Sequence, residues 1–579
     1  MKLLWKFGNE AIRYKALYII AIISTFMLTL LNLTAPKVLA SMTGLVKDGV
    51  TEDKLDGIFT LALILLGIYL VRVVFTFLAS FLSHKAAWNL VGDVRIKMYD
   101  KLQSLSMSFY HDKQTGDLMS RIVNDTNSLE LLYAHIIPDL ITSLVTVAGV
   151  MIMLLTINWK LALLTCIPIP VILAMGVLFS KKILPYFRKN QTVTGELNAL
   201  LQDNISGISE IQAFAKEKEE SAKISSKVAE SVSAMLRALK LSGLFHPSVG
   251  FISAVGTVIV VAAGGYLAYL GEVGVEDIVA FLLYLSLFYA PITGLAQLLE
   301  NTQQAYAGAE RAMLILASEN EIRETEDAKE MTRPKGAVKF EHVSFGYKDG
   351  EKVLEDVSFE CRPGEMIAFC GPTGVGKTTM SKLISRIYDP DSGKILIDGE
   401  DIKDFTLHSL RKNIAPVLQD TFLFNATIAE NIGYAKDNAT TEEIQAAAKA
   451  AYIHDEIMAM PEGYRTKVGE RGLRLSGGQK QRISIARAIV CDAPIIILDE
   501  ATASVDAETE KRIQDAINSL MGSRTILVIA HRLSTIRNAD KIIVLENGKI
   551  AESGRHDELL SKKGLYYRAY EIQKSGMIA

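Results

Sequence analysis

The 579-residue sequence predicts a chain of two unlike parts: an all-α membrane region of six helices with long cytoplasmic extensions, then an α/β domain. Three observations carry this prediction. Long apolar stretches occur only before residue 300, the polar connections between them alternate in length, and a glycine-rich loop follows an apolar strand in the second part. We expect residues 1–320 to form the membrane region, 321–335 a linker and 336–579 the α/β domain.

Six apolar stretches approach or exceed the roughly 20 residues that a helix needs to cross the hydrocarbon core of a bilayer. They cover residues 17–46, 57–83, 136–157, 159–180, 249–270 and 276–296. Beyond residue 320 the apolar runs are short, like Met366–Cys370 and Ile495–Leu498, and predict strands. A secretory signal peptide is the alternative for the first stretch. That stretch is too long for one, and its removal would leave five spans.

Basic residues indicate the side of the membrane on which the connections lie. Lysine and arginine concentrate in the N-terminal segment and in residues 85–126 and 185–240. The short loops opposite carry only Lys47, Lys54 and Lys160. We therefore expect a multi-pass protein of the cytoplasmic membrane, with both termini in the cytoplasm. The two long connections are rich in helix formers and should extend the membrane helices, with coupling segments near 113–121 and 208–219.

Composition argues against two other kinds of function. The net charge is −3, with 62 basic and 65 acidic residues, and this balance gives no sign of a nucleic-acid partner. Four cysteines occur, and none has the spacing of a metal or redox site. They are Cys166, Cys361, Cys370 and Cys491. We expect them to be reduced and unpaired.

The strongest motif is an octapeptide that follows the apolar strand Met366–Cys370 and opens a helix at about Lys377, the context of a phosphate-binding loop. Its residues are Gly371, Pro372, Thr373, Gly374, Val375, Gly376, Lys377 and Thr378. Glycines let backbone N–H groups point at phosphate oxygens, and the helix N-terminus adds partial positive charge. We expect Lys377 to hold the β- and γ-phosphates of ATP, Thr378 to bind Mg²⁺, and Thr379 to contact the nucleotide.

Two further segments support this interpretation. The run Ile495–Leu498 ends in Asp499 and Glu500. The first carboxylate suits Mg²⁺, and the second can accept a proton from the attacking water, which makes Glu500 the candidate base. The pentapeptide Leu475, Ser476, Gly477, Gly478 and Gln479 precedes a helical stretch. Its hydroxyl and backbone N–H groups at a helix N-terminus offer a second anion site.

This pentapeptide resembles the signature sequence of ATP-binding cassette proteins, and the resemblance extends over residues 337–570. It implies a P-loop nucleotide-binding fold with helical and antiparallel β subdomains. It further implies that Tyr347 stacks on adenine, that Gln419 senses Mg²⁺ and that His531 holds the γ-phosphate. Ser504 and Asp506 resemble the loop that crosses the dimer interface.

The membrane region is similar to bacterial half-size exporters of drugs, lipids or peptides, through residues 108–121 and 207–214. In this family ATP is sandwiched between the phosphate loop of one cassette and the signature of the other. One of each occurs per chain, so the resemblance implies a dimer. A homodimer is favoured because no catalytic element is missing, and a heterodimer stays open. We expect an ATP hydrolase that drives export of a hydrophobic or amphipathic substrate by alternating access, with ATP and Mg²⁺ as cofactors.

Two other functions stay open: an ATP-gated channel or regulatory subunit, and an importer of the same fold. A soluble P-loop kinase is excluded by the six spans. The substrate is not indicated, and the candidate cavity residues are the polar ones in or near the spans. They are Arg72, Asp139 and Glu300, with His135, His246, Gln297, Gln303 and Gln304.

Arg72 interrupts the apolar stretch Leu61–Leu82, where a charge costs about 2.5–3.5 kcal/mol on insertion scales. It either pairs with Asp139 or Glu300, or reaches the headgroups, or faces a cavity and recruits anionic substrates.

Overall fold

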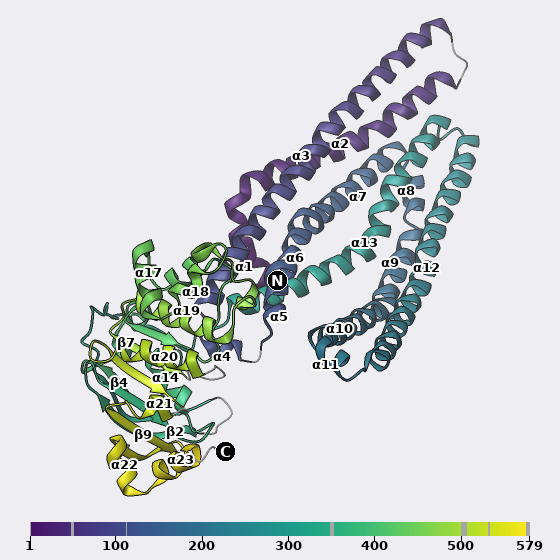
Figure 1. The fold of residues 1–579 in the computed structure, drawn as a ribbon. Helices are drawn as coiled ribbons and strands as arrows, with labels where there is room; N and C mark the ends of the chain where they lie inside the picture. The colour runs from purple at the N-terminus through teal and green to yellow at the C-terminus, as the bar shows by residue number, and fades with distance from the viewer. Residues whose placement is uncertain are drawn as a thin grey trace. The chain divides into compact units, whose positions relative to one another are not determined.

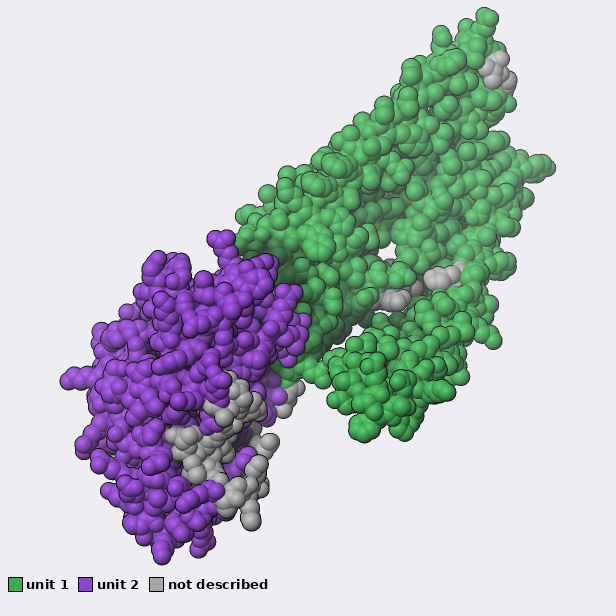
Figure 2. All heavy atoms as spheres, viewed as in Figure 1, with its two compact units in different colours: residues 1–104, 113–318 green, residues 105–112, 319–579 purple. Residues whose placement is uncertain are grey.

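The computed structural model describes residues 2–47, 51–111, 113–347, 352–499, 507–530 and 533–574. The chain folds into two compact units, coloured separately in Figure 2. Unit 1 comprises Met1–Ser104 and Lys113–Ser318, and unit 2 comprises Leu105–Asp112 and Glu319–Ala579.

The described residues of unit 1 form helices joined by short turns, with no strand among them. Its elements in chain order are α1 (Lys2–Ala11), η1 (Ile12–Tyr14), α2 (Lys15–Val46), α3 (Glu52–Ser104), α5 (Thr115–Ser120), η2 (Arg121–Asp125), α6 (Asn127–Glu130), η3 (Leu131–Ile136), α7 (Ile137–Ile157), α8 (Trp159–Thr165), α9 (Pro168–Leu178), η4 (Phe179–Ile183), α10 (Leu184–Ser206), α11 (Ile208–Ala213), α12 (Glu217–Tyr269) and α13 (Val275–Leu316).

Among the described residues, six helical segments are long and apolar enough to cross a membrane. They are Phe7–Val46, Glu52–Ser104, Thr115–Ile157, Trp159–Ser206, Glu217–Tyr269 and Val275–Gly294. Each contains or overlaps one predicted stretch, so the prediction of six spans is confirmed.

The polar connections of unit 1 are largely helical. Helices α3 and α12 have 53 residues each, about 80 Å at a rise of about 1.5 Å per residue, against roughly 30 Å of hydrocarbon. Helices α10 and α12 lie side by side, and α11 closes the turn between them (Figure 1). The predicted helical extensions are therefore present, and α11 lies within the segment 208–219.

Buried tyrosines and one ion pair join the helices of unit 1. The hydroxyl of Tyr284 donates to the carbonyl oxygen of Leu33 at 2.6 Å, and that of Tyr289 donates to the carbonyl oxygen of Thr165 at 2.8 Å. At the other end of α13, the Arg311 guanidinium donates twice to the Asp125 carboxylate, at 2.6 and 2.7 Å. Helix α13 is thus tied to α2, α8 and η2.

The described residues of unit 2 form two sheets. The antiparallel sheet has the order β2-β1-β4-β5, from β1 (Val338–Gly346), β2 (Lys352–Cys361), β4 (Ser392–Ile397) and β5 (Glu400–Asp401). The second sheet has the order β10-β9-β3-β8-β7-β6, from β3 (Met366–Cys370), β6 (Ile414–Val417), β7 (Ile495–Asp499), β8 (Thr525–Ile529), β9 (Lys541–Glu546) and β10 (Lys549–Gly554). Strands β9 to β6 are parallel, and β10 is an antiparallel edge.

The described residues of unit 2 also form helices, several of which cover the second sheet (Figure 1). They are α4 (Met107–Tyr110), α14 (Lys377–Ile384), η5 (Ile402–Asp404), α15 (Leu407–Lys412), α16 (Ile428–Gly433), α17 (Thr441–Ala450), α18 (His454–Met458), η6 (Gly463–Arg465), η7 (Glu470–Gly472), α19 (Gly477–Val490), α20 (Ala507–Asn518), α21 (Leu533–Ile536), α22 (His556–Lys562) and α23 (Leu565–Lys574).

Successive residues of a strand face opposite sides of the sheet, and this alternation builds two cores. Ala368 and Leu498 belong to a core with the helical stretch α16–α19. Phe369 and Ile497 belong to a second core with α14 and the antiparallel sheet. The central strands are buried on both faces, as parallel strands usually are. The predicted fold class, with helical and antiparallel β subdomains, is confirmed.

The segment expected as a linker packs onto unit 2. The Met331 N–H donates to Ser409 Oγ at 2.9 Å, and the Lys329 N–H donates to the Asp404 carbonyl at 2.8 Å. Met331 is also buried in the second core. The polar composition of the segment gave no sign that it packs against unit 2. Because a compact unit need not coincide with a functional domain, the boundaries 1–320, 321–335 and 336–579 stay a prediction.

Candidate functional site

The phosphate-loop sequence forms the turn between β3 and α14. Gly376 is the N-cap of α14 with φ +101°, and a methyl group there would lie 2.6 Å from Leu354 Cδ2. Gly371, with φ +144°, is equally crowded against the carbonyl oxygen of Leu545. Only glycine fits such positions. The backbone N–H groups of the loop and of the first turn of α14 therefore form an anion-binding turn.

The rest of the loop divides into an exposed tip and a buried base. Pro372, Thr373 and Gly374 are exposed, whereas Val375 is buried under the turn. Burial raises the pKa of the Cys370 thiol, at the end of β3, to about 12. This thiol therefore stays protonated beside the loop. All four cysteines lie in described residues and are unpaired, as the sequence predicted.

Lys377 and Thr378 bring an ammonium and a hydroxyl group to this turn. The Lys377 ammonium donates to the carbonyl oxygens of Gly371 and Pro372, both at 2.8 Å, so it lies across the loop. The Thr378 hydroxyl donates to a carboxylate oxygen of Asp499 at 3.4 Å. Asp499 ends β7 and is almost fully buried. Hydroxyl and carboxylate oxygens are donors that Mg²⁺ prefers, so this pair fits a magnesium ion.

Sheet order explains why these residues meet. Strand β8 separates β3 from β7, and all three run parallel. Their carboxyl ends therefore lie at one edge, where ligands bind in open α/β sheets. Gln419 follows β6 by two residues, is exposed and belongs to the same edge, because Val417 pairs with Leu498.

Tyr347 stands beside the first turn of α14. Its hydroxyl lies 3.2 Å from Thr379 Oγ1, and the Lys382 ammonium lies 5.8 Å from its ring centroid. The ring packs edge-on against Tyr388, with centroids 5.4 Å apart. The half-buried Tyr347 ring is therefore held next to the loop by three contacts, where a flat base could stack on it.

Four predicted site residues lie outside the described residues. They are Glu500, Ser504, Asp506 and His531. Glu500 follows Asp499 directly in the sequence, and His531 follows β8 by two residues.

The signature segment caps α19. Ser476 is the N-cap: its Oγ accepts from the Gln479 N–H at 3.2 Å, and the Gln479 side chain accepts from the Ser476 N–H at 2.9 Å. This reciprocal capping fixes the entry of the chain into the helix. Leu475 and Gly478 are buried, whereas Ser476 and Gly477 are exposed. The exposed Ser476 and Gly477 therefore stand at the N-terminus of α19, where an anion site would lie.

A carboxylate that the sequence did not indicate holds this cap. Glu456 Oε2 accepts from the Gln479 amide at 3.2 Å, and the Glu456 carboxylate accepts twice from Arg482, at 2.7 and 3.0 Å. Arg512 adds a third charged partner at 2.9 Å. Burial by itself would raise the pKa of Glu456, but the hydrogen bonds from Arg482 and Gln479 outweigh it and hold that pKa below its usual range. No sequence motif marks Glu456.

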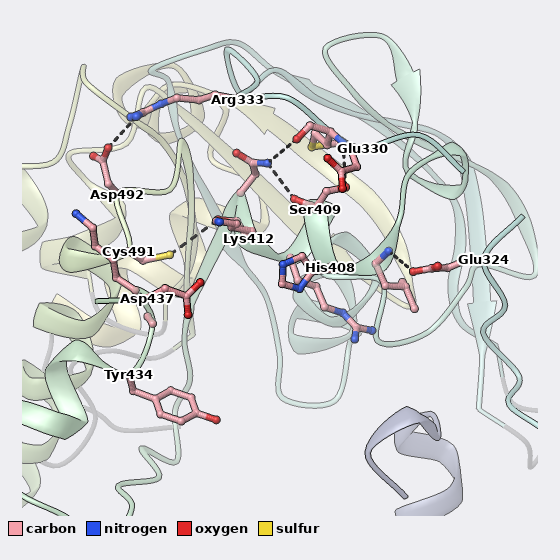
Figure 3. A pocket seen from close by; sticks show the side chains of 16 residues that line it. Glu324, Glu330, Arg333, His408, Ser409, Lys412, Tyr434, Asp437, Cys491 and Asp492 are labelled. Carbon is pink, nitrogen blue, oxygen red and sulfur yellow. Dashed lines mark hydrogen bonds and ion pairs between the residues drawn. The ribbon is translucent and has the colours of Figure 1, made fainter. Parts of the chain in front are cut away.

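Unit 2 also has a polar hollow of about 1100 Å³ (Figure 3). Its walls come from the docked segment 324–333, α15, residues 434–437 after α16, and Cys491–Asp492. Arg333 and Arg524 both pair with Asp492, at 2.8 and 2.7 Å. Burial alone would raise the pKa of Asp492, but these guanidinium groups hold it below its usual range. The ion pair between Arg333 and Asp492 therefore helps to attach the docked segment to the rest of unit 2.

The membrane candidates of unit 1 do not gather into one ion-pair cluster. Among the side chains that the structure describes, no carboxylate forms an ion pair with Arg72, and Asp139 is exposed. The side chain of Glu300 is not among those that the structure describes. Arg72 instead lines a groove of about 770 Å³ on α3. The groove residues are Tyr69, Arg72, Val73, Thr76, Phe77, Ser80, Phe81 and His84.

Three features define unit 2 as a P-loop ATPase. They are the glycine-rich anion-binding loop, the hydroxyl–carboxylate pair at the sheet edge and the capped signature helix. This unit belongs to a chain whose described residues include six helical segments long and apolar enough to cross a membrane. Comparisons with known proteins agree with this class. Residues 18–292 match the family model of the ABC transporter transmembrane region, and residues 354–503 match the ABC transporter family model.

Relatives match across both units. An ATP-dependent lipid A-core flippase of Syntrophus aciditrophicus is 39% identical over 89% of this chain and 85% of its own length. A fatty acid ABC transporter ATP-binding/permease protein of Mycobacterium bovis is 39% identical over 88% of this chain and 80% of its own. A solved bacterial Atm1-family ABC exporter with ATP bound superposes with a TM-score of 0.85 at 30% identity, covering 97% and 98% of the two chains.

The chain belongs to the ATP-binding cassette transporter family. It is a multi-pass membrane protein and a nucleotide-binding ATPase that drives export. As a half-size exporter it works as a dimer within a lipid bilayer. The predicted family, activity and export function are confirmed.

Proposed function

We propose that two copies of this chain export a hydrophobic or amphipathic substrate out of the cytoplasm by alternating access. The observation that carries the proposal is the Thr378–Asp499 pair beside the anion loop, in a chain that also holds six spans. The unit 2 domains and both termini lie in the cytoplasm, since the basic residues concentrate in the long connections.

Each ATP is held between two chains. The phosphate loop of one copy contacts one side of the triphosphate, and the signature segment of the other copy contacts the opposite side. The exposure of Ser476 and Gly477 at the N-terminus of α19 supports this arrangement, because a hydroxyl group and a helix N-terminus there can bind a γ-phosphate. A homodimer then has two such sites. A heterodimer with a related chain is the alternative.

The sheet edge supplies the catalytic groups. Thr378 and Asp499 would hold Mg²⁺, with Gln419 beside them, and the ion supplies neutralisation of phosphate charge. Lys377 binds the β- and γ-phosphates, and Tyr347 stacks on adenine. Glu500 accepts the proton of the attacking water, and His531 contacts the γ-phosphate. Ser504 and Asp506 line the contact between the two chains.

ATP binding and hydrolysis switch the exporter between two states. A ligand shifts an equilibrium only through its differential affinity for the states, and an ATP that contacts both chains favours the closed pair. The segments near 113–121 and 208–219 transmit this closure to the membrane helices. Helices α10 and α12 are continuous and packed together, which suits them to act as rigid levers.

The α3 groove supports an amphipathic substrate of negative charge. Arg72, Thr76 and Ser80 recur at every fourth residue, so they share one helix face. Tyr69 and Phe77 flank them and supply apolar surface. With Asp139 and Glu300, Arg72 is a candidate contact for the headgroup of such a substrate. Relatives named for lipid A-core and for fatty acid also support a lipid-like substrate.

Transport in proteoliposomes tests the direction and the substrate class. The purified chain is reconstituted, ATP is added outside, and fluorescent anionic lipids and hydrophobic cations are followed by quencher protection. Only molecules with unit 2 outside can use this ATP. We expect ATP-dependent movement of anionic lipid into the lumen, away from unit 2. Movement toward unit 2 would indicate an importer, and ATP-dependent ion leak without accumulation would indicate a channel.

A further inference from the structure

Three polar side chains converge in unit 1 where two predicted apolar stretches end. His84 follows the stretch 57–83 on α3, and His135 precedes the stretch 136–157. His84 Nδ1 lies 2.8 Å from Glu130 Oε1, and His135 Nε2 lies 3.5 Å from the same oxygen. The ligand atoms of all three residues lie within 4.8 Å of one another. Two imidazoles are thus aimed at one carboxylate oxygen.

We propose that His84, Glu130 and His135 bind one divalent transition-metal ion of the Zn²⁺ type per chain. Two histidines and a glutamate are a donor set of zinc sites that keep an open position. A neutral imidazole carries a lone pair on one ring nitrogen, so each histidine can offer one ligand atom to a metal. A single histidine would be enough to form an ion pair with the Glu130 carboxylate. An ion pair alone therefore does not explain why a second histidine points to the same oxygen.

The separations suit a small ion. Zinc–nitrogen and zinc–oxygen bonds of about 2.0–2.2 Å place tetrahedral ligands about 3.3–3.5 Å apart. The His135–Glu130 separation of 3.5 Å matches this edge, and the His84–Glu130 separation of 2.8 Å is somewhat shorter. The imidazole rings meet edge-on, with centroids 4.8 Å apart. His135 is the most exposed of the three, at 46% of its side chain, so its ring can rotate to close the set.

The backbone supplies an independent reason for the cluster. Glu130 and His135 are five residues apart, and in an α-helix such residues lie about 140° apart around the axis. The segment η3 (Leu131–Ile136) is a π-helix. Its i→i+5 hydrogen bonds bring residues five apart to one face. The π-helical turn is therefore what directs His135 toward Glu130, and such turns are frequent at functional sites.

An ion here would join α3 to the α6–η3 segment. Glu130 is 17% exposed and His84 is 35% exposed, so an ion can enter and still keep coordination positions for water. His84 also lines the α3 groove. The site thus lies at one end of the surface that we propose for substrate.

Metal titration of the full-length chain tests this proposal. The protein is purified in detergent through a tag without histidine, stripped with EDTA and titrated with Zn²⁺ against a chromogenic chelator. We expect one high-affinity ion per chain, and Co²⁺ should give the intense visible absorption of a tetrahedral site. His84→Ala and Glu130→Gln should each weaken Zn²⁺ binding by roughly 100-fold or more, since even second-shell changes cost about 10–100-fold.

His342→Ala is the matched control. His342 lies 2.7 Å from Asp356 on unit 2, a histidine–carboxylate pair that belongs to no three-ligand group among the described residues. It should leave Zn²⁺ binding unchanged. His135→Ala, at an exposed position, provides a variant that should fold normally. The proposal is overturned if the stripped protein binds no ion above the level of His135→Ala, or if His342→Ala weakens binding as much as His84→Ala does.

Discussion

Replacing Glu456 with glutamine should loosen the signature helix without touching ATP. Glu456 is the common acceptor for Arg482, Arg512 and Gln479, and Gln479 caps α19. The Arg482 side chain is 3% exposed, so the substitution leaves a buried cation without its counter-charge. The catalytic groups of the phosphate loop belong to other elements and keep their contacts.

The size of the effect follows from these contacts. Removing one partner of a buried ion pair costs about 3–5 kcal/mol. Glutamine can still accept one hydrogen bond, and Arg482 keeps the carbonyl oxygens of Tyr452 and Gly478, at 2.8 and 3.2 Å. We therefore expect Glu456→Gln to lower the free energy of unfolding of unit 2 by about 2–3 kcal/mol. The unit 2 transition should fall by about 4–12 °C.

Thermal unfolding of the full-length chain measures this loss, and the unit 2 transition is the one that shifts upward with ATP. ATP binding should persist while steady-state ATPase activity falls. Glu508→Gln is the control, because Glu508 is 77% exposed and pairs with Arg512 at 2.7 Å. It should cost less than about 0.5 kcal/mol. Equal stability of the two variants would refute the reasoning.

The same carboxylate gives a pH dependence. The pKa of Glu456 is held below its usual range in the folded unit, so its contribution is complete above the unfolded pKa of about 4.3. This contribution is lost as pH falls through the folded pKa. On acidification the wild-type chain should lose the free energy of unfolding that the Glu456 ion pairs contribute. Glu456→Gln lacks this contribution, so its free energy of unfolding should fall less over the same pH range.

Three further substitutions, with Gly399→Ala as a matched control, probe the proposed roles. Glu500→Gln should still bind ATP but hydrolyse it ~10²–10⁴-fold more slowly, since a positioned base is lost; near-normal single-turnover hydrolysis would remove Glu500 from this role. Gly376→Ala should abolish ATP binding, because its methyl group would lie 2.6 Å from Leu354 Cδ2 and 3.0 Å from the carbonyl oxygen of Val353, which would displace the loop. Gly399 also has a positive φ, of +87°, but a methyl group there would meet no neighbour within 4 Å. The backbone strain should therefore cost each of the two alanine variants about 1–2 kcal/mol of stability. Only Gly376→Ala should lose nucleotide binding in a titration. Arg72→Ala should reduce ATPase stimulation by anionic amphiphiles several-fold and leave basal activity and unfolding unchanged; unaltered stimulation by every substrate would assign Arg72 to a structural role.

Local sequence order was enough to predict the phosphate site. The strand, the glycine turn and the start of α14 are contiguous, so their geometry follows from neighbouring residues. Hydropathy predicted the six spans for a similar reason, because a membrane helix satisfies its own backbone hydrogen bonds. The meeting of Thr378 with Asp499 depends on the sheet order as well, because β8 lies between β3 and β7.

Contacts between distant residues could not be predicted in this way. Glu456 on α18 and Arg482 on α19 meet across two separate helices, and neither stands in a recognisable pattern. The convergence of His84 and His135 depends on a π-helical turn, which hydrophobic periodicity does not reveal. The segment before β1 seemed a free linker by composition, yet Met331 is buried. These features arise from tertiary packing.

A two-tag mixing experiment tests the shared ATP site most directly. Lys377→Ala disables the phosphate loop of one chain and Ser476→Arg disables the signature of the other, so each homodimer should be inactive. Mixed dimers, isolated through both tags, keep one complete site and should occlude one nucleotide and hydrolyse ATP at roughly half the wild-type rate. Mixed dimers that occlude no nucleotide and show no hydrolysis would contradict a site shared between two chains.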